Sequence, residues 1–341
     1  MKTLLKQLTE TFGPSGYEGD VRKLVRAEVE PFADELKVDA LGNLIVRKKP
    51  LKGTKDAKKI MIAAHMDEIG LMVSHVDENG FVRFSAIGGV FRRYVPGGRV
   101  RFLNGTQGVI GYDRLDNINE LPALDKVYID VGAAGKKDCP VKIGDVAAFD
   151  RPFTEMGNRL VAKSMDDRVG VLVAIETLRS LTLPYAQGGA STPHDLYFVF
   201  TTQEEVGVRG AATSAYGVDP DLGIALDVTP AGDTPKALKM EMALGKGPCI
   251  KIQDPGMIAD PRVVQWMIRT AEKNKIPYQR EVLLMGSTDA RAIQLARAGV
   301  PAGCLSIPVR YVHSPSEMVD YSDVQNSVKL LTALLRAPIG L

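Results

Sequence analysis

The sequence predicts an α/β fold that is interrupted by a β-rich module, and three observations support this prediction. Apolar runs typical of buried strands alternate with helical periodicity over the first 69 residues and again after residue 160, as in a layered α/β domain. Between them, short alternating runs separated by glycines replace any helical pattern. The chain has 341 residues, which is enough for about two domains of roughly 150 residues each.

The first segment contains two expected helices followed by strands. Apolar residues at helical spacing predict the helices, and the breaker segment Pro14–Gly16 separates them. A strand pair is expected within Glu35–Arg47. The apolar run Lys59–Ala64 predicts a buried strand that ends in the polar residues His65-Met66-Asp67-Glu68. Since α/β folds place active sites at the carboxyl ends of their strands, these polar residues are candidates for function.

The middle segment, from about residue 70 to residue 159, has the sequence pattern of a small β domain. Runs such as Phe81–Phe84, Val100–Phe102 and Val127–Ile129 alternate polar and apolar residues, and Gly88-Gly89 is typical of the punctuation between them. Short strands at this spacing indicate a small barrel or sandwich inserted into the α/β domain.

After Leu160 the alternation of helices and strands resumes. The expected elements are a helix over Arg168–Leu181, a strand over Asp195–Thr202, a helix over Val208–Tyr216, a strand over Leu222–Asp227, helices over Arg262–Asn274 and Thr288–Ala298, a strand over Ala302–Ser306 and a helix over Tyr321–Arg336. The polar stretch Tyr185–Pro193 is expected to be a loop.

Composition excludes several classes of protein. Hydrophobic residues make up 45% and charged residues 25% of the chain, which is typical of a globular protein and not of a disordered one. The 43 Lys and Arg nearly balance the 41 Asp and Glu, so neither a nucleic-acid nor a membrane partner is expected. No apolar run approaches the ~18 residues of a membrane span, and no signal-peptide core begins the sequence. Three dispersed cysteines fit a reducing compartment, so we expect a cytoplasmic protein.

Two of the four histidines lie in polar clusters at strand ends. His65 is followed by Asp67, and a carboxylate in that position can orient a metal-bound imidazole by accepting its second N–H. His313 lies in the segment Ile307–Pro315, which follows the expected apolar strand Ala302–Ser306. Taken alone, such a histidine is more often a structural residue with satisfied hydrogen bonds. The two histidines therefore gain weight only together with nearby acids.

Acidic residues follow other predicted strands or begin a helix. Asp166 and Asp167 open an apolar helix, where they could simply complement the helix dipole. Glu204 and Glu205 directly follow an apolar strand, and adjacent carboxylates repel unless a cation or a shared proton lies between them. Asp227 ends another strand. Oxygen and nitrogen donors without cysteine favour zinc, cobalt or manganese, and two bridged metals would leave one acid for proton transfer. The sequence therefore predicts a dinuclear metal hydrolase.

These segments, taken in order, resemble the tetrahedral metalloaminopeptidases, a family related to glutamyl aminopeptidases and to proteins once labelled cellulase M. The resemblance covers essentially the whole chain. The matching segments are Pro14–Glu18, Ala64–Gly70, Asp166–Gly170, Gln203–Gly207, Ala225–Asp227 and Arg310–Glu317.

The resemblance implies two divalent metal ions per subunit, with zinc expected and cobalt or manganese as alternatives. Asp166 would bridge them, His65 and Asp227 would complete one site, and Glu205 and His313 would complete the other.

Further roles also follow from the resemblance. Glu204 would be the general base that takes a proton from the attacking water and returns it to the leaving amine, and Asp67 would orient His65. A cis peptide is expected between Asp166 and Asp167. The implied activity removes N-terminal residues from short peptides.

The implied architecture is an α/β/α zinc-peptidase catalytic domain with a mixed sheet, formed by residues 1–69 and 160–341. Residues 70–159 would form an inserted β-barrel dimerisation domain, and dimers would assemble into a homo-oligomer, the dodecamer of the family. A lid or substrate domain is the alternative for this module. The segment Leu284–Ala290 resembles a loop near the pocket for the first side chain, but it equally fits a helix start capped by Ser287.

Other functions remain open from the sequence. A carboxypeptidase, a dipeptidase or an N-acyl-amino-acid deacylase can use an equivalent pair of metals. A glycoside hydrolase would need two carboxylates and no obligatory metal. A non-catalytic assembly protein is the third alternative, but no candidate position has lost its polar residue.

Overall fold

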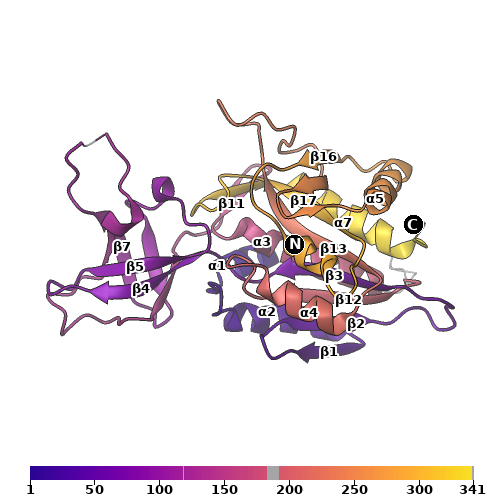
Figure 1. Ribbon diagram of the computed structural model, residues 1–341, viewed down its shortest axis with the longest axis horizontal. Coiled ribbons are helices and arrows are strands. Elements are labelled where there is room, and N and C mark those ends of the chain that lie inside the picture. The colour runs from indigo at the N-terminus through magenta and orange to yellow at the C-terminus, as the bar shows by residue number, and fades with distance from the viewer. Residues whose placement is uncertain (118, 183–191, 340–341) are drawn as a thin grey trace.

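The computed structural model describes residues 1–117, 119–182 and 192–339, and in it the chain forms a large α/β body and a smaller β-barrel beside it (Figure 1). The barrel is inserted between strands of the large body, as its purple colour between indigo and magenta segments indicates. Both bodies have their own cluster of buried apolar side chains.

The large body is built on a mixed sheet of 12 strands. The main path, in spatial order, is β1 (Glu35–Val38), β2 (Leu44–Lys48), β12 (Asp195–Thr201), β3 (Lys59–His65), β13 (Leu222–Pro230), β17 (Ala302–Arg310), β18 (Glu317–Asp320), β11 (Arg159–Ala162) and β10 (Thr154–Met156). A side branch of β14 (Cys249–Asp254), β15 (Met257–Ile258) and β16 (Gln279–Val282) joins at β17. The central strands β12, β3, β13 and β17 are parallel, so their carboxyl ends meet at one edge.

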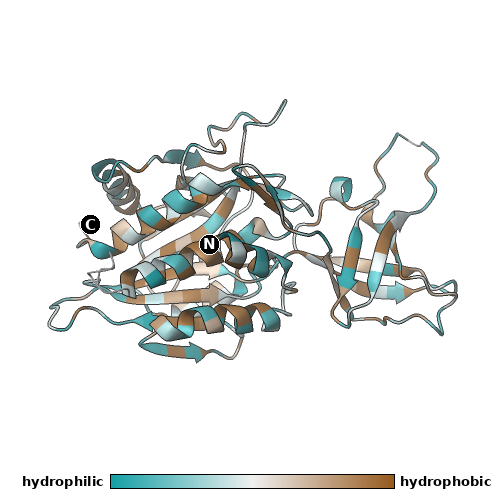
Figure 2. Cartoon of the chain, turned by 180° about the vertical axis from the view of Figure 1, so that it is seen from behind, coloured by the Kyte–Doolittle hydropathy of each residue, from teal (hydrophilic) through white to brown (hydrophobic). Residues whose placement is uncertain are grey.

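Helices cover both faces of this sheet. One face carries α3 (Met165–Thr182) and α7 (Tyr321–Arg336), with α1 (Lys2–Glu10) and α2 (Gly19–Val29) packed on α3 and α5 (Pro261–Lys273) packed on α7. The other face carries α4 (Arg209–Val218) and α6 (Asp289–Gln294). Figure 2 shows the resulting pattern, with apolar residues along the central strands and on one side of each helix.

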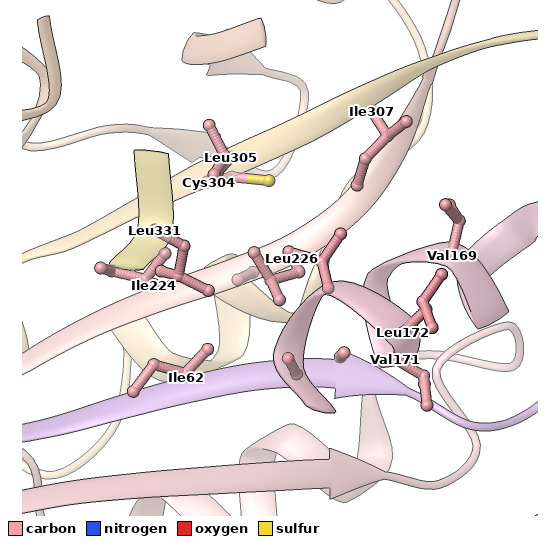
Figure 3. Close-up of a cluster of buried hydrophobic side chains, with 14 of the residues drawn as sticks. Ile62, Val169, Val171, Leu172, Ile224, Leu226, Cys304, Leu305, Ile307 and Leu331 are labelled. Carbon is pink, nitrogen blue, oxygen red and sulfur yellow. The ribbon is translucent and has the colours of Figure 1, made fainter. Parts of the chain in front are cut away.

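Alternation along β3 divides the apolar side chains between the two faces. Ile60 and Ile62 belong to the large core under α3 and α7, whereas Met61 and Ala63 belong to a second cluster under α4 and α6. Figure 3 shows part of the large core, where Ile62 lies near side chains of β13, α3 and α7. The residues of β3 therefore fix the position of its last residue, which belongs to the functional site.

The smaller body is a closed barrel of six strands. In barrel order these are β4 (Gly70–Val76), β5 (Val82–Ile87), β8 (Val127–Asp130), β7 (Gln107–Tyr112), β6 (Arg99–Phe102) and β9 (Val146–Phe149). Within the described residues of the segment 70–159, the only helical turns are the short 3₁₀ helices Arg92–Tyr94 and Leu124–Lys126. Of the two alternatives that the sequence left open, the barrel is correct and the sandwich is wrong.

Several expected elements differ in the structure. The helix α6 ends at Gln294 and not at Ala298, and its N-cap is Thr288, which accepts from Ala290 N at 3.3 Å, so the expected cap Ser287 is wrong. The backbone of Asp166 and Asp167 is not helical, and the peptide between them is cis, as expected. Most of the expected loop at 185–193 lies outside the described residues.

Candidate metal centre

The carboxyl edge of the parallel strands gathers the polar residues that the sequence singled out. His65 is the last residue of β3, Asp227 lies near the end of β13, and Glu204 and Glu205 follow β12. Thr201 of β12 pairs with His65, which brings the turn after β12 beside it. The cis peptide at the start of α3 and the turn after β17 bring further polar residues to the same edge.

Two groups of possible metal donors share one aspartate. His65, Asp166 and Asp227 form the first group, and Asp166, Glu205 and His313 form the second; within each group the donor atoms lie within 4.8 Å of one another. The two carboxylate oxygens of Asp166 face different groups. Oδ1 lies 3.0 Å from His65 Nε2, and Oδ2 lies 3.3 Å from His313 Nε2. His313 Nε2 also lies 3.2 Å from Glu205 Oε2.

The acids of this site are poorly solvated and close to one another. Burial raises the pKa of Asp227 well above its usual value, and the charge of Asp166 adds to the effect. Burial also raises the pKa of Glu205. Burial opposes protonation of His313, but the charges of Glu205 and Asp166 raise its pKa to about 12. Buried carboxylates need positive charge beside them, and a divalent cation supplies it more effectively than imidazolium does.

The donor set therefore fits a metal. It offers imidazole nitrogens and carboxylate oxygens, no thiolate, and one carboxylate that faces both groups. This chemistry suits zinc, cobalt or manganese.

Asp67 connects several parts of the site. Its Oδ1 accepts from Glu204 N at 3.0 Å, and its Oδ2 accepts from Glu205 N at 3.1 Å and from Ser15 Oγ at 2.6 Å. His65 Nδ1 lies 3.1 Å from the backbone oxygen of Asp67 and 3.5 Å from its carboxylate. The nearest acceptor for this ring nitrogen is thus the backbone oxygen and not the carboxylate.

Two further groups that contact His313 had no role in the prediction from the sequence. Gly89 lies in the loop that follows β5 of the barrel, and its backbone oxygen lies 2.9 Å from His313 Nδ1. Glu317 accepts from His313 N at 2.7 Å and from Asp166 N at 2.9 Å through its two carboxylate oxygens. Glu317 is part of a segment that the sequence had marked, whereas nothing in the sequence distinguishes a glycine that acts through its carbonyl.

Asp289 is a further acid at this edge, and it belongs to the segment Leu284–Ala290, for which the sequence left open a loop near the substrate pocket or a helix start. It is 1% exposed, and its Oδ2 accepts from Thr201 Oγ1 at 2.5 Å. Burial raises its pKa to about 6. Burial likewise raises the pKa of the half-buried Glu204, and the charges of Asp227 and Asp289 contribute.

A sequence model of the M42 glutamyl aminopeptidase family matches residues 42–330 of the chain. The chain belongs to this family. It is therefore an aminopeptidase, and the M42 family is one of metallopeptidases. A relative in Acetivibrio thermocellus is 46% identical over 97% of both chains. A lysyl aminopeptidase of Pyrococcus furiosus is 37% identical over 97% of this chain and 96% of its own.

Solved structures agree with this family. An aminopeptidase from the archaeon Desulfurococcus kamchatkensis is 43% identical to this chain and superposes with a TM-score of 0.92. The match covers 98% of this chain and 94% of the archaeal one. Two TET1 structures are each 32% identical, with TM-scores of 0.87 over 99% of both chains. One is described as a dodecamer, and the other, from Pyrococcus horikoshii, as able to form a tetrahedron or a large octahedral shell. The resemblance to tetrahedral metalloaminopeptidases and the expected fold are thus confirmed.

The structure also brings together all the residues that the sequence singled out as ligands or as catalytic groups of this M42 peptidase. They are His65, Asp67, Asp166, Glu204, Glu205, Asp227 and His313. In the described part of the chain, no helix combines the length and the hydropathy that a membrane span requires.

Proposed function

We propose that this M42 peptidase holds two divalent metal ions and releases N-terminal residues from short peptides, with Glu204 as general base. The observation that carries the proposal is the position of Asp166, whose two oxygens face two separate histidines. One ion would be held by His65, Asp166 and Asp227, and the other by Asp166, Glu205 and His313. Zinc is the first choice, and cobalt or manganese are alternatives.

When bound, such a pair of ions polarises the scissile carbonyl and makes a water molecule more acidic. Neither group of donors includes Glu204, which follows the same strand as the proposed ligand Glu205. The backbone N–H of Glu204 donates to Asp67 Oδ1, and burial raises the pKa of the Glu204 carboxyl group, which makes it a better proton acceptor than an exposed glutamate. Glu204 would take the proton of the attacking water and donate it to the leaving amine.

Recognition of a free α-amine needs a group that metal binding leaves available. Three of the four central carboxylates, those of Asp166, Glu205 and Asp227, would bind the two ions, which leaves the Glu204 carboxylate and the ions themselves as the groups that can hold a free α-amine. The M42 relatives include enzymes named for lysyl and for glutamyl substrates. The preferred first residue is therefore a separate question from the exopeptidase chemistry.

For assembly, we propose that residues 1–69 and 160–341 are the catalytic domain and that the barrel segment 70–159 mediates dimers, which build a dodecamer. The TET1 structures described as a dodecamer and a tetrahedron support this proposal. Light scattering on the purified protein tests it, and a monomer at micromolar concentration would contradict it.

The decisive test of the chemistry is Glu204→Gln, with Glu205→Gln as its matched neighbour. Glu204→Gln should lower kcat by about 10²–10⁴-fold with the metal content unchanged, because only the proton carrier is lost. Glu205→Gln should lower the metal content as well. The substrates are aminoacyl-anilides, free and N-acetylated. Normal turnover by Glu204→Gln, or cleavage of the acetylated set, would refute the proposal and favour a deacylase in the second case.

A further inference from the structure

The N-terminal segment Pro14–Glu18 takes no part in the chemistry proposed above, yet it contacts Asp67 and the turn that carries Glu204. The carboxylate of Glu18 is buried, with 4% of the residue exposed. Its Oε1 accepts two backbone hydrogen bonds, from Gly16 N at 2.7 Å and from Gln203 N at 3.1 Å. Gln203 immediately precedes the proposed base, so Glu18 holds the first residue of the turn that presents it.

The same turn is held by a second carboxylate. Asp67 accepts from Glu204 N and Glu205 N, so three successive N–H groups point at two buried acids. Gln203 has φ +56°, a left-handed conformation that non-glycine residues rarely adopt. A left-handed residue within such a turn directs successive N–H groups to one side, where they form a binding concavity for anions. In this protein the anions are the chain's own carboxylates.

Ser15 also contacts Asp67, the second of these two carboxylates. Its Oγ donates to Asp67 Oδ2 at 2.6 Å, and its N–H donates to Glu68 O at 3.3 Å. Glu68 N in turn donates to Gly13 O at 3.1 Å, and Glu68 Oε1 accepts from Gly13 N at 3.0 Å. The segment 13–18 is thereby joined to the end of β3 on one side and to the turn 203–205 on the other.

We infer that Ser15 and Glu18 are positioning residues that hold the backbone of Gln203 and Glu204 and thereby fix the reach of the Glu204 carboxylate. The inference rests on the proposed role of Glu204 as general base. Neither residue belongs to the two groups of metal donors. Their loss should therefore misplace the base without removing metal. A shift of a catalytic group by about 1 Å can cost on the order of 10²-fold in rate.

The test compares Glu18→Ala, Glu18→Gln and Ser15→Ala in the full chain loaded with metal. Glu18→Ala should lower kcat by about tenfold to a hundredfold, with KM changed by less than about threefold and the metal content unchanged. Glu18→Gln keeps a carbonyl acceptor and should stay within about threefold of the original kcat. Ser15→Ala removes one hydrogen bond to Asp67 and should lower kcat by a smaller factor. This variant tests the inference even if Glu18→Ala does not fold.

A readout independent of turnover is amide hydrogen exchange of residues 203–205. Exchange there should become faster in Glu18→Ala, while exchange in the central strands stays the same. The control is Asp323→Ala. Asp323 is also a buried carboxylate that accepts two backbone N–H groups, from Gly245 and Gly247, but it lies on α7 and belongs to no donor group of the metal centre. It should lower stability and leave kcat unchanged.

The double variant Glu18→Ala with Glu204→Gln separates this inference from the proposed function. If Glu18 acts through Glu204, the loss caused by Glu18→Ala disappears once Glu204 is Gln. Full activity of the single variant Glu204→Gln would instead refute the general base itself. An unchanged kcat in Glu18→Ala, an equal loss in Glu18→Gln, a loss that follows metal content, or the same loss in Asp323→Ala would each overturn the inference.

Discussion

Substitution of Gly89 by Ala should weaken one of the two proposed metal sites, although Gly89 is not itself a ligand. A Cβ atom at this position would lie 2.4 Å from His313 Nδ1 and 2.7 Å from His313 Cε1. An ordinary contact is 3.4 Å or more, so the imidazole must move by about 1 Å. That movement would also disrupt the contact between His313 Nδ1 and Gly89 O, which is 2.9 Å in the structure.

The size of the effect follows from the role of such outer contacts. Loss of the group that orients a metal-bound histidine costs about 10–100-fold in metal affinity. This corresponds to roughly 1.4–2.7 kcal/mol, because each tenfold change in a dissociation constant is about 1.4 kcal/mol. Only the ion held by Glu205 and His313 should be affected, since the three atoms nearest to the added Cβ all belong to His313.

Both metal affinities can be measured by titrating zinc into the metal-free protein in the presence of a competing chelator. Gly217→Ala is the matched control, because the position is within α4 and, apart from its chain neighbours and the backbone of its own helix, no atom lies within 4 Å of the added Cβ. It should leave metal binding unchanged and stabilise the helix by about 0.5–1 kcal/mol. Wild-type affinity for both ions in Gly89→Ala would refute the reasoning, and so would an equal loss at both.

Three further outcomes are expected. Lys251→Ala should cost about 3–5 kcal/mol of unfolding free energy, because Glu281, whose Oε1 lies 2.5 Å from Lys251 Nζ, would be left buried and unpaired; a denaturant midpoint within error of the original would contradict this. A thiol reagent should label Cys139 in the native protein and reach Cys249 and Cys304 only after denaturation, since the last two are 0% exposed and burial raises their pKa. Metal at about 1,000 times its dissociation constant should stabilise the protein by about 4 kcal/mol, so a chelator should lower the melting temperature; an unchanged melting temperature would exclude a tightly held ion.

The sequence predicts the central sheet well and its side branch poorly, and the reason is where charge is buried. In β3, β12 and β13 nearly all buried side chains are apolar, so the strands stand out as apolar runs. β14 and β16 instead bury Lys251 and Glu281 against each other. A pattern that treats charged residues as exposed cannot recognise such strands, because the partner that makes burial possible lies 30 residues away.

The same distinction applies to the site. The proposed metal ligands His65 and Asp227 end apolar runs of the sequence and can be recognised by that position. Gly89 acts through a backbone oxygen, which every residue possesses, so only the folded chain reveals it. The capping residue of α6 shows a smaller limit, because Ser287 and Thr288 are chemically equivalent candidates and only backbone geometry selects Thr288.

The contacts of the barrel bear on how assembly and chemistry are related. Gly89 contacts His313, Phe91 lies over the His313 ring at 5.7 Å between centroids, and a Cβ on Gly88 would meet Glu205 at 3.1 Å. A module that served assembly alone would need none of these contacts. Because the loop that follows β5 holds a proposed metal ligand, any force on the barrel that shifts this loop also changes the affinity for that ion. Linkage is reciprocal, so if assembly changes the affinity for that ion by some factor, binding of the ion changes the affinity of assembly by the same factor. If the barrel forms the dimer contact, the metal centre and the oligomer are therefore coupled through Gly89.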